Sequence, residues 1–92
     1  MSVYVDDSAW PYRGQLYCHM IADTTEELNA MADAIGLKRS WLQDAGTWKE
    51  HYDLAPSRRA RAVRNGAIEI TGRELGRMLT RRLEASRQDV TR

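Results

Sequence analysis

The chain has 92 residues, 42% hydrophobic and 29% charged, which fits one small globular domain over residues 1–92 and excludes extensive disorder. Its single cysteine, Cys18, excludes an internal disulfide, and no apolar run approaches the roughly 18 residues of a membrane span. Because a single cysteine cannot form an internal disulfide, a reducing cytoplasm is the expected compartment, and no signal-peptide pattern opens the chain.

The net charge of +1 conceals two oppositely charged parts. Residues 1–56 carry nine acidic and four basic side chains, for a net charge of −5. Residues 57–92 carry ten arginines and four acidic side chains, for a net charge of +6. Arginine binds carboxylates and phosphates through a planar fork that lysine lacks. The basic part therefore indicates internal neutralisation, a genome rich in G and C, or an anionic partner.

Two strands are predicted near the start of the chain. Residues 2–6 alternate around β-branched and aromatic side chains, and residues 15–22 are largely apolar on both faces. Pro11 and Gly14 interrupt any regular pattern between them, which predicts a loop over residues 7–14. The simplest connection is an antiparallel hairpin with a long loop.

The strongest pattern in the chain predicts a helix that ends at Gly36. Thr24, followed three residues later by Glu27, forms a capping box at its start, with Asp23 as an alternative cap. The apolar residues of this segment recur at helical spacing and form one stripe: Leu28, Met31, Ala32 and Ile35.

The remaining segments are shorter. Residues 37–50 predict an ordered loop with at most one short strand, and residues 51–54 an extended piece. Ser57 caps a predicted short helix over residues 58–65, because Pro56 keeps the residue before it out of the helical region. Residues 67–70 alternate and predict another short strand.

An arginine-rich helix over residues 72–87 completes the chain, with a frayed tail beyond it. Thr71 and Glu74 form its capping box. The elements together predict an α+β fold, in which two to three helices pack on one side of a small, mostly antiparallel sheet. The apolar stripe of the last helix consists of Leu75, Met78, Leu79 and Leu83.

His51 and Asp53 are the first candidate site residues. In an extended segment they point to the same face, about 6–7 Å apart along the strand. This spacing suits two ligands of one metal, or a histidine oriented by a carboxylate. His-x-Asp alone is a weak motif, and two ordinary surface residues are the alternative.

His19 and Asp6 are further candidates. His19 faces away from Cys18 on a strand, and the chain has no Cys-x-x-Cys, which excludes a zinc finger. A core histidine bonded to backbone is the alternative. If the first two strands form a hairpin, Asp6 and Asp23 lie at opposite ends of the sheet. A site would then combine Asp6 with loop residues such as Arg13, or Asp23 with His19.

Arg58 and Arg59 follow Ser57 at the start of a predicted helix, where backbone N–H groups and two guanidiniums favour an anion. No glycine-rich loop accompanies them, which excludes a Walker-type nucleotide site. Two solvated arginines are the alternative. Four aromatic residues form either a stacking platform or the bulk of the core: Trp10, Tyr12, Trp41 and Trp48.

Three segments of the chain, VYVDD, CHMIADTTEELNAMADAIG and HYDLAPSRRARAVRNGAIEIT, resemble the small bacterial and phage family catalogued as domain of unknown function number 4031. The resemblance covers residues 2–75. It implies no activity, because that family has none assigned, but a pattern built on His, Asp and Arg favours a site over packing. The matching positions are Asp6, His19, Asp23, Glu26, Trp41, His51, Asp53, Arg59, Ala62 and Gly66.

We therefore predict a polar cleft that gathers His19, His51, Asp53 and Arg59. In it an imidazole acts as base or metal ligand, Asp53 orients the imidazole, and Arg59 holds a phosphate or carboxylate. The expected ligand is a phosphorylated or other anionic small molecule, and hydrolytic or metal-assisted chemistry fits the residues. The sequence assigns no cofactor and no set of metal ligands, and it does not decide whether the protein is an enzyme. The catalytic candidates are His19, His51 and Asp53, and the ligand-binding candidates are Asp6, Arg58 and Arg59.

A non-catalytic interaction module is the alternative. In that case the arginine-rich residues 57–92 bind nucleic acid or an acidic protein, and His51 and Asp53 are structural. A homodimer built through the helix stripes is compatible with either interpretation. No membrane partner is expected.

Overall fold

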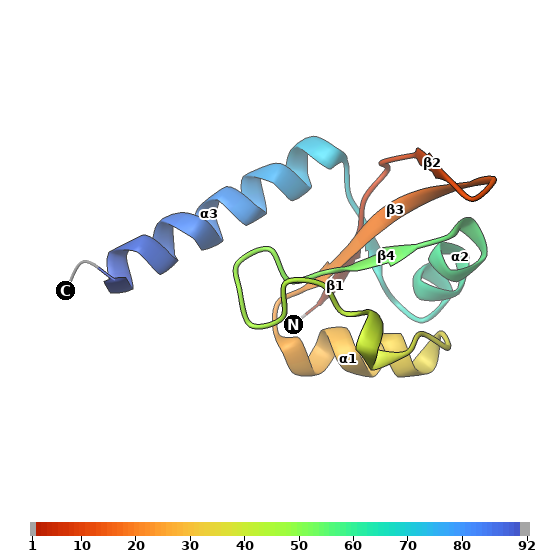
Figure 1. The fold of residues 1–92 in the computed structure, drawn as a ribbon, viewed down its shortest axis with the longest axis horizontal. Helices are drawn as coiled ribbons and strands as arrows, with labels where there is room; N and C mark the ends of the chain where they lie inside the picture. Colours follow the sequence, from red (N-terminus) through yellow and green to blue (C-terminus); the bar gives the residue numbers. More distant parts are fainter. Residues whose placement is uncertain (1, 91–92) are drawn as a thin grey trace.

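In the computed structural model, which describes residues 2–90 and the side chains of residues 2–87, three α-helices accompany a five-stranded sheet (Figure 1). The prediction of an α+β fold with a mostly antiparallel sheet is confirmed. No helix in the described part of the chain combines the length and apolar character needed to cross a membrane. The strands are β1 Val3–Val5, β2 Trp10–Tyr12, β3 Gln15–Ala22, β4 Tyr52–Leu54 and β5 Ile68–Glu69.

The eight-residue strand β3 organises the sheet, because β1, β2 and β4 all pair with it antiparallel. The order is β2-β3-β1-β5, with β4 paired to β3 off this path and β5 parallel to β1. In the pairing of β3 with β4, His19 lies opposite Asp53. Since directly opposed residues on a sheet share a face, this register places two candidate site residues side by side.

The segment predicted as a loop over residues 7–14 contains the strand β2. Because of Pro11, the sequence pattern did not predict a strand here. β2 nevertheless pairs with β3 and lies at the end of the strand order, where the missing N–H of a proline is tolerated. Arg13 and Gly14 both have positive φ, 50° and 79°, as a tight two-residue hairpin turn requires. The expected antiparallel pairing of the first two predicted strands is confirmed, because β1 pairs with β3. The connection between them is not a plain loop, since it contains β2 and a tight β2–β3 hairpin.

The three helices are α1 Thr25–Ala34, α2 Pro56–Arg64 and α3 Gly72–Val90, and the short 3-10 helix η1 covers Arg39–Trp41. Thr24 caps α1 as predicted, accepting a hydrogen bond from the backbone N–H of Glu27. Asp23 is no cap: it accepts from the backbone N–H of Ser2 and the hydroxyl of Tyr4 instead. The helix α2 begins at Pro56 rather than Arg58, because proline suits a first helical position where no N–H is required.

One hydrophobic core lies between the sheet and the helices α1 and α2. Alternate residues of β1, β3 and β4 point into it, which leaves the other face of the sheet to Tyr4, His19 and Asp53. The core residues are Val3, Val5, Cys18, Met20, Ala22, Leu28, Met31, Ala32, Ile35, Leu37, Tyr52, Leu54, Ala62 and Ala67.

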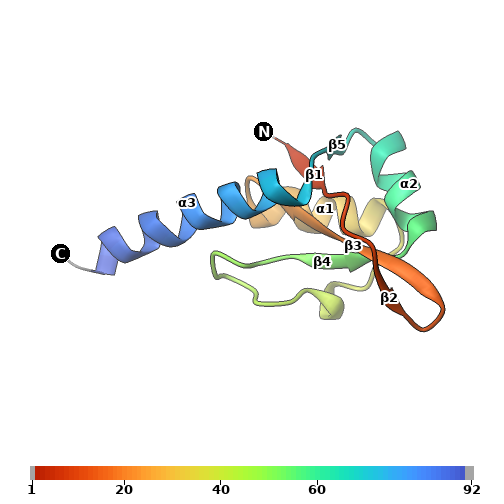
Figure 2. The same ribbon diagram turned by 90° about the horizontal axis from the view of Figure 1, so that it is seen from above.

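The helix α3 projects away from the rest of the domain (Figures 1 and 2). Its first turns are anchored by the buried Leu75, and Arg82 donates a hydrogen bond to the carbonyl oxygen of Ala22 at 2.6 Å. The helix continues to Val90, beyond the predicted end at residue 87. The rest of the predicted frayed tail, residues 91–92, lies outside the described residues.

Replacing a core side chain tests the packing. Leu28→Ala removes a side chain that is 1% exposed, so we expect the free energy of unfolding to fall by about 2–5 kcal/mol. The control is Leu16→Ala, because Leu16 is 54% exposed and should change stability by less than about 0.5 kcal/mol. Urea denaturation followed by circular dichroism measures both, and equal losses would contradict this placement of the core.

Candidate functional site

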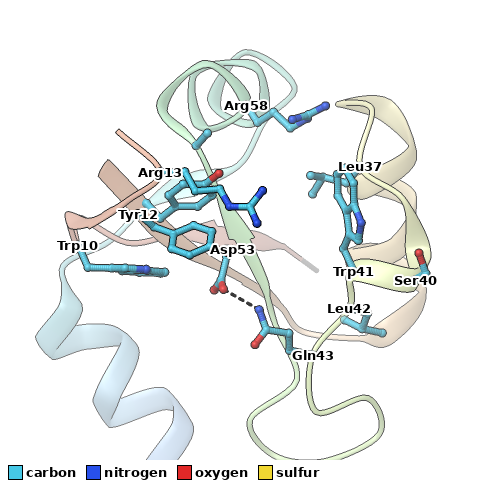
Figure 3. A pocket seen from close by; sticks show the side chains of 12 residues that line it. Trp10, Tyr12, Arg13, Leu37, Ser40, Trp41, Leu42, Gln43, Asp53 and Arg58 are labelled. Atoms are coloured by element: carbon cyan, nitrogen blue, oxygen red, sulfur yellow. Dashed lines mark hydrogen bonds between the residues drawn. The ribbon is translucent and has the colours of Figure 1, made fainter. Parts of the chain in front are cut away.

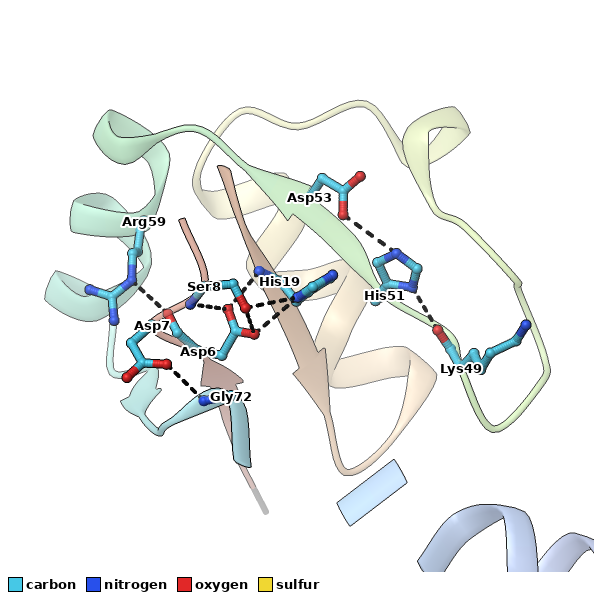
Figure 4. A network of polar contacts seen from close by, with 9 residues as sticks. All are labelled: Asp6, Asp7, Ser8, His19, Lys49, His51, Asp53, Arg59 and Gly72. Carbon is cyan, nitrogen blue, oxygen red and sulfur yellow. Dashed lines mark hydrogen bonds and ion pairs between the residues drawn. The ribbon is translucent and has the colours of Figure 1, made fainter. Parts of the chain in front are cut away.

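A fully buried carboxylate lies at the end of β1. Asp6 is 0% exposed and accepts hydrogen bonds from the hydroxyl of Ser8, the backbone N–H of His19 at 2.9 Å and the Nδ1 atom of His19 at 2.9 Å (Figure 4). The pairing of β1 with β3 sets this geometry, because the backbone N–H of Asp6 also donates to the carbonyl of His19. Asp6 therefore pairs with His19, and not with Arg13 as the sequence analysis considered.

These hydrogen bonds keep Asp6 ionised. Burial by itself raises the pKa of the carboxyl group, but the hydrogen bonds from Ser8 and His19, and the charge of His19, outweigh burial and lower the pKa of Asp6 below its usual range. An ionised carboxylate only accepts hydrogen bonds, so Nδ1 of His19 carries a proton and donates it. In the neutral ring the lone pair of His19 is then on Nε2, the nitrogen directed away from Asp6 (Figure 4).

Ser8 is not an activated nucleophile in this arrangement. Its hydroxyl donates to Asp6 and lies 3.5 Å from Nδ1 of His19, the nitrogen that already binds the same carboxylate. A Ser-His-Asp triad needs the serine and the carboxylate on opposite nitrogens of the ring. The role of Ser8 is therefore to hold Asp6.

His51 has the same tautomer as His19, set by a different partner. Its Nδ1 atom lies 2.6 Å from the carbonyl oxygen of Lys49. A carbonyl oxygen only accepts, so Nδ1 must donate, and the lone pair of the neutral ring is on Nε2. That Nε2 atom faces the Oδ1 atom of Asp53 at 3.4 Å.

Asp53 is satisfied on one oxygen only. Its Oδ2 atom accepts a hydrogen bond from the side-chain amide of Gln43 at 2.6 Å. Its Oδ1 atom is buried and has no hydrogen-bond partner among the described residues. A buried acceptor left without a partner costs about 1–3 kcal/mol, and here it faces a nitrogen lone pair. A proton or a cation between the two atoms removes that cost.

His19, His51 and Asp53 form one cluster. The two imidazole rings meet edge to face with their centroids 5.4 Å apart. Each residue has one nitrogen or oxygen atom that could bind a metal, and these three atoms lie within 4.8 Å of one another. Trp10 covers the ring of His19, at 4.5 Å between centroids, so the cluster has an aromatic wall on one side.

The comparisons with known proteins give a family but no activity. A family model with the description "Protein of unknown function (DUF4031)" matches residues 3–82. The chain belongs to the DUF4031 family. The matched range includes all three residues of the cluster in this DUF4031 chain. A search of curated proteins and a search of solved structures found no match.

The two candidate arginines of the DUF4031 chain lie outside this cluster. Arg59 donates to the carbonyl oxygen of Asp6 at 3.0 Å and pairs with Glu69 at 2.9 Å, on the far side of Asp6 from His51 (Figure 4). Arg58 donates to the carbonyl oxygens of residues 35 and 36, at the end of α1. Their ligand-binding role stays a prediction.

Sequence reasoning missed the residues that fix the two rings. Ser8 follows a strand without any pattern of its own, and Lys49 contributes a backbone carbonyl, which no side-chain motif reveals. Gln43 reaches Asp53 because an isolated bridge pairs Gln43 with His51. Gln43 is ten residues before Asp53, and nothing in the sequence distinguishes its side-chain amide from that of an ordinary loop residue.

The single cysteine takes no part in the site. Cys18 is buried on the core face of β3, and burial, reinforced by the nearby charge of Asp6, raises the pKa of its thiol to about 11. The thiolate that nucleophilic or metal chemistry requires is therefore scarce at neutral pH.

Removing the charge of Asp6 tests the network beneath the cluster. We expect Asp6→Asn to lower the free energy of unfolding at pH 7 by about 2–4 kcal/mol, because buried donors lose a charged acceptor. The folded-state pKa of Asp6 is lowered, so its stabilisation is complete above the unfolded-state pKa of about 4 and is lost as the pH falls through the folded value. The variant should therefore lose less stability than the wild type below about pH 4.

Thermal and urea melts between pH 2 and pH 7 measure this difference. The matched control is Asp44→Asn, an exposed position in the loop before β4, which should shift stability by less than about 0.5 kcal/mol. If Asp6→Asn and Asp44→Asn had the same pH dependence, Asp6 would not be the buried anchor of His19.

Proposed function

We propose that the domain binds a divalent transition metal through His19, His51 and Asp53 and uses it to hold and polarise an anionic small ligand. The observation that carries the proposal is the cluster of His19, His51 and Asp53, whose ligand atoms lie within 4.8 Å of one another. In both histidines Nδ1 already has a partner, and one buried oxygen of Asp53 has none among the described residues.

The surroundings of both histidines support a metal. A histidine that binds a metal commonly donates its other ring N–H to a carboxylate or a backbone carbonyl, which fixes the tautomer and makes the ligating nitrogen more basic. His19 donates to the carboxylate of Asp6, and His51 donates to the carbonyl of Lys49. Both kinds of partner therefore occur in one site.

The spacing between His51 and Asp53 fits two ligands of one ion. Metal–ligand bonds of about 2.0–2.2 Å in a tetrahedral site separate two ligand atoms by about 3.3–3.6 Å. The Nε2 and Oδ1 atoms of these residues are 3.4 Å apart. A cation between them also gives Oδ1 the partner that it lacks.

The donor set favours particular metals and leaves room for chemistry. Two imidazoles and one carboxylate suit Zn²⁺, Fe²⁺, Co²⁺ or Mn²⁺ better than Mg²⁺ or Ca²⁺, which prefer oxygen ligands. Three protein ligands leave at least one coordination position for a ligand oxygen or a water. A metal lowers the pKa of a bound water to about 7, so the same site supports hydrolysis of the bound anion.

The interaction-module alternative concerns a different surface. Three arginines of the basic part bind backbone carbonyls of the first 56 residues: Arg58, Arg59 and Arg82. Arg73, Arg77 and Arg81 instead lie exposed on α3, the helix that projects from the domain. A nucleic-acid partner on these side chains would bind much more weakly as salt is added, and changes at His51 would not alter it.

Metal titration tests the proposal. We expect Co²⁺ to bind the wild-type protein with the visible absorption of a low-symmetry site, and Zn²⁺ to displace it and raise the melting temperature. Asp53→Asn removes one ligand charge and His51→Ala one ligand, so each should weaken binding at least about 100-fold, whereas Asp6→Asn acts through His19 and should weaken it about 10–100-fold.

Asp44→Asn is the matched control for Asp53→Asn and should leave the affinity unchanged. Circular dichroism of each variant without metal separates a lost ligand from a lost fold. Should His51→Ala and Asp53→Asn both stay folded and bind Co²⁺ as tightly as the wild type, the three residues are not a metal site.

A further inference from the structure

A cavity of about 760 Å³ adjoins the cluster and shares Asp53 with it (Figure 3). The volume lies within the range of about 300–1,000 Å³ that is usual for small-molecule sites. Asp53 projects from the sheet into the space between two walls of the cavity, and these walls belong to different parts of the chain. Of the three residues of the cluster, Asp53 lines the cavity, so this side chain connects the cavity with the metal proposed above.

The first wall is the β2–β3 hairpin. Trp10 and Tyr12 project from it, and Tyr17 contacts both of their rings, at 6.2 and 5.7 Å between centroids. Tyr12 remains 53% exposed. Because Trp10 also covers His19 at 4.5 Å, this aromatic wall extends from the cavity to the candidate metal centre.

The second wall lies across the cavity and centres on Trp41, with Leu37 and Leu42 beside it (Figure 3). Trp41 is 47% exposed, yet two cations contact its ring, Lys38 at 5.7 Å and Arg58 at 5.8 Å. Arg58 is itself held by the carbonyls at the end of α1. The ring of Trp41 is thus exposed to solvent but held in place by two cations, which suits it to stack against a ligand.

The charges of the cavity favour an anion. Arg13 and Arg58 line it, and Asp53 is the acidic residue among its lining side chains. A metal on Asp53 would neutralise that carboxylate and leave the cavity positive. Aromatic walls bind flat rings, at about 1–3 kcal/mol for each stacked base, and guanidiniums bind phosphate oxygens.

We infer that this cavity binds a phosphorylated ligand that carries an aromatic ring, of the nucleoside monophosphate class. The ring occupies the space between the hairpin wall and Trp41, and the phosphate reaches the metal and the guanidiniums. This inference rests on the proposed metal site, since the metal supplies the principal anchor for the phosphate.

Isothermal titration of the Zn²⁺-loaded protein with AMP, GMP, CMP and UMP tests the inference. Adenosine, ribose 5-phosphate and inorganic phosphate serve as partial ligands. At least one nucleoside monophosphate should bind at least tenfold more tightly than phosphate and ribose 5-phosphate, because these two lack the aromatic ring. It should also bind at least tenfold more tightly than adenosine, because adenosine lacks the phosphate. Phosphate binding equal to that of all four nucleotides would overturn the aromatic part of the inference.

Variants of the two walls locate the binding. Trp41→Ala and Tyr12→Ala should each weaken nucleotide binding about 5–100-fold and leave the Zn²⁺ affinity unchanged. The matched control is Trp48→Ala, because Trp48 lies outside this cavity and should leave nucleotide affinity unchanged. If neither wall variant weakens nucleotide binding while both stay folded, the cavity is not the ligand site.

The experiments distinguish a failure of the proposed metal site from a failure of the proposed ligand class. Tight Zn²⁺ binding without nucleotide binding overturns the ligand class and leaves the metal site standing. Nucleotide binding that is equal with and without Zn²⁺, and equal in Asp53→Asn, overturns the role given to the metal.

Discussion

The hydrogen bond between the buried carboxylate of Asp6 and the ring of His19 is the constraint on which the site depends. Asp6 has no access to water and is held ionised by Ser8 and by the backbone and ring of His19. An ionised buried carboxylate is costly unless it is fully bonded, so the ring of His19 has one stable position and one tautomer. Its second nitrogen is thereby held in one direction.

The register of the sheet brings the other two residues to that nitrogen. Cys18, His19 and Met20 pair with Leu54, Asp53 and Tyr52, so Asp53 shares a face with His19 while its neighbours in both strands enter the core. A slip of one residue would exchange the two faces, burying Asp53 and exposing Tyr52 and Leu54. The burial that stabilises the fold therefore also fixes the positions of the polar residues.

The site is less well satisfied than the core beneath it. One oxygen of Asp53 has no partner among the described residues, and two aromatic rings beside the site, Tyr12 and Trp41, stay about half exposed. The unpartnered oxygen of Asp53 reduces the stability of the fold. Local costs of this kind are often found at functional sites, which is consistent with the proposed role of the cluster.

The sequence by itself determined the elements whose patterns are local: the apolar stripe and capping box of α1, the long apolar strand β3, and the alternation in the HYDL segment that puts His51 and Asp53 on one face. It did not show β2, because Pro11 masks a strand that is allowed only at an edge, nor the start of α2 at Pro56. The residues also suggested that His19, His51 and Asp53 share a cleft. The register that puts His19 opposite Asp53, the anchoring of His19 by Asp6, the position of Arg59 outside the cluster and the opposed aromatic walls were decided by the tertiary structure alone. Strand pairing joins residues more than thirty positions apart, and local periodicity carries no information about which strands pair.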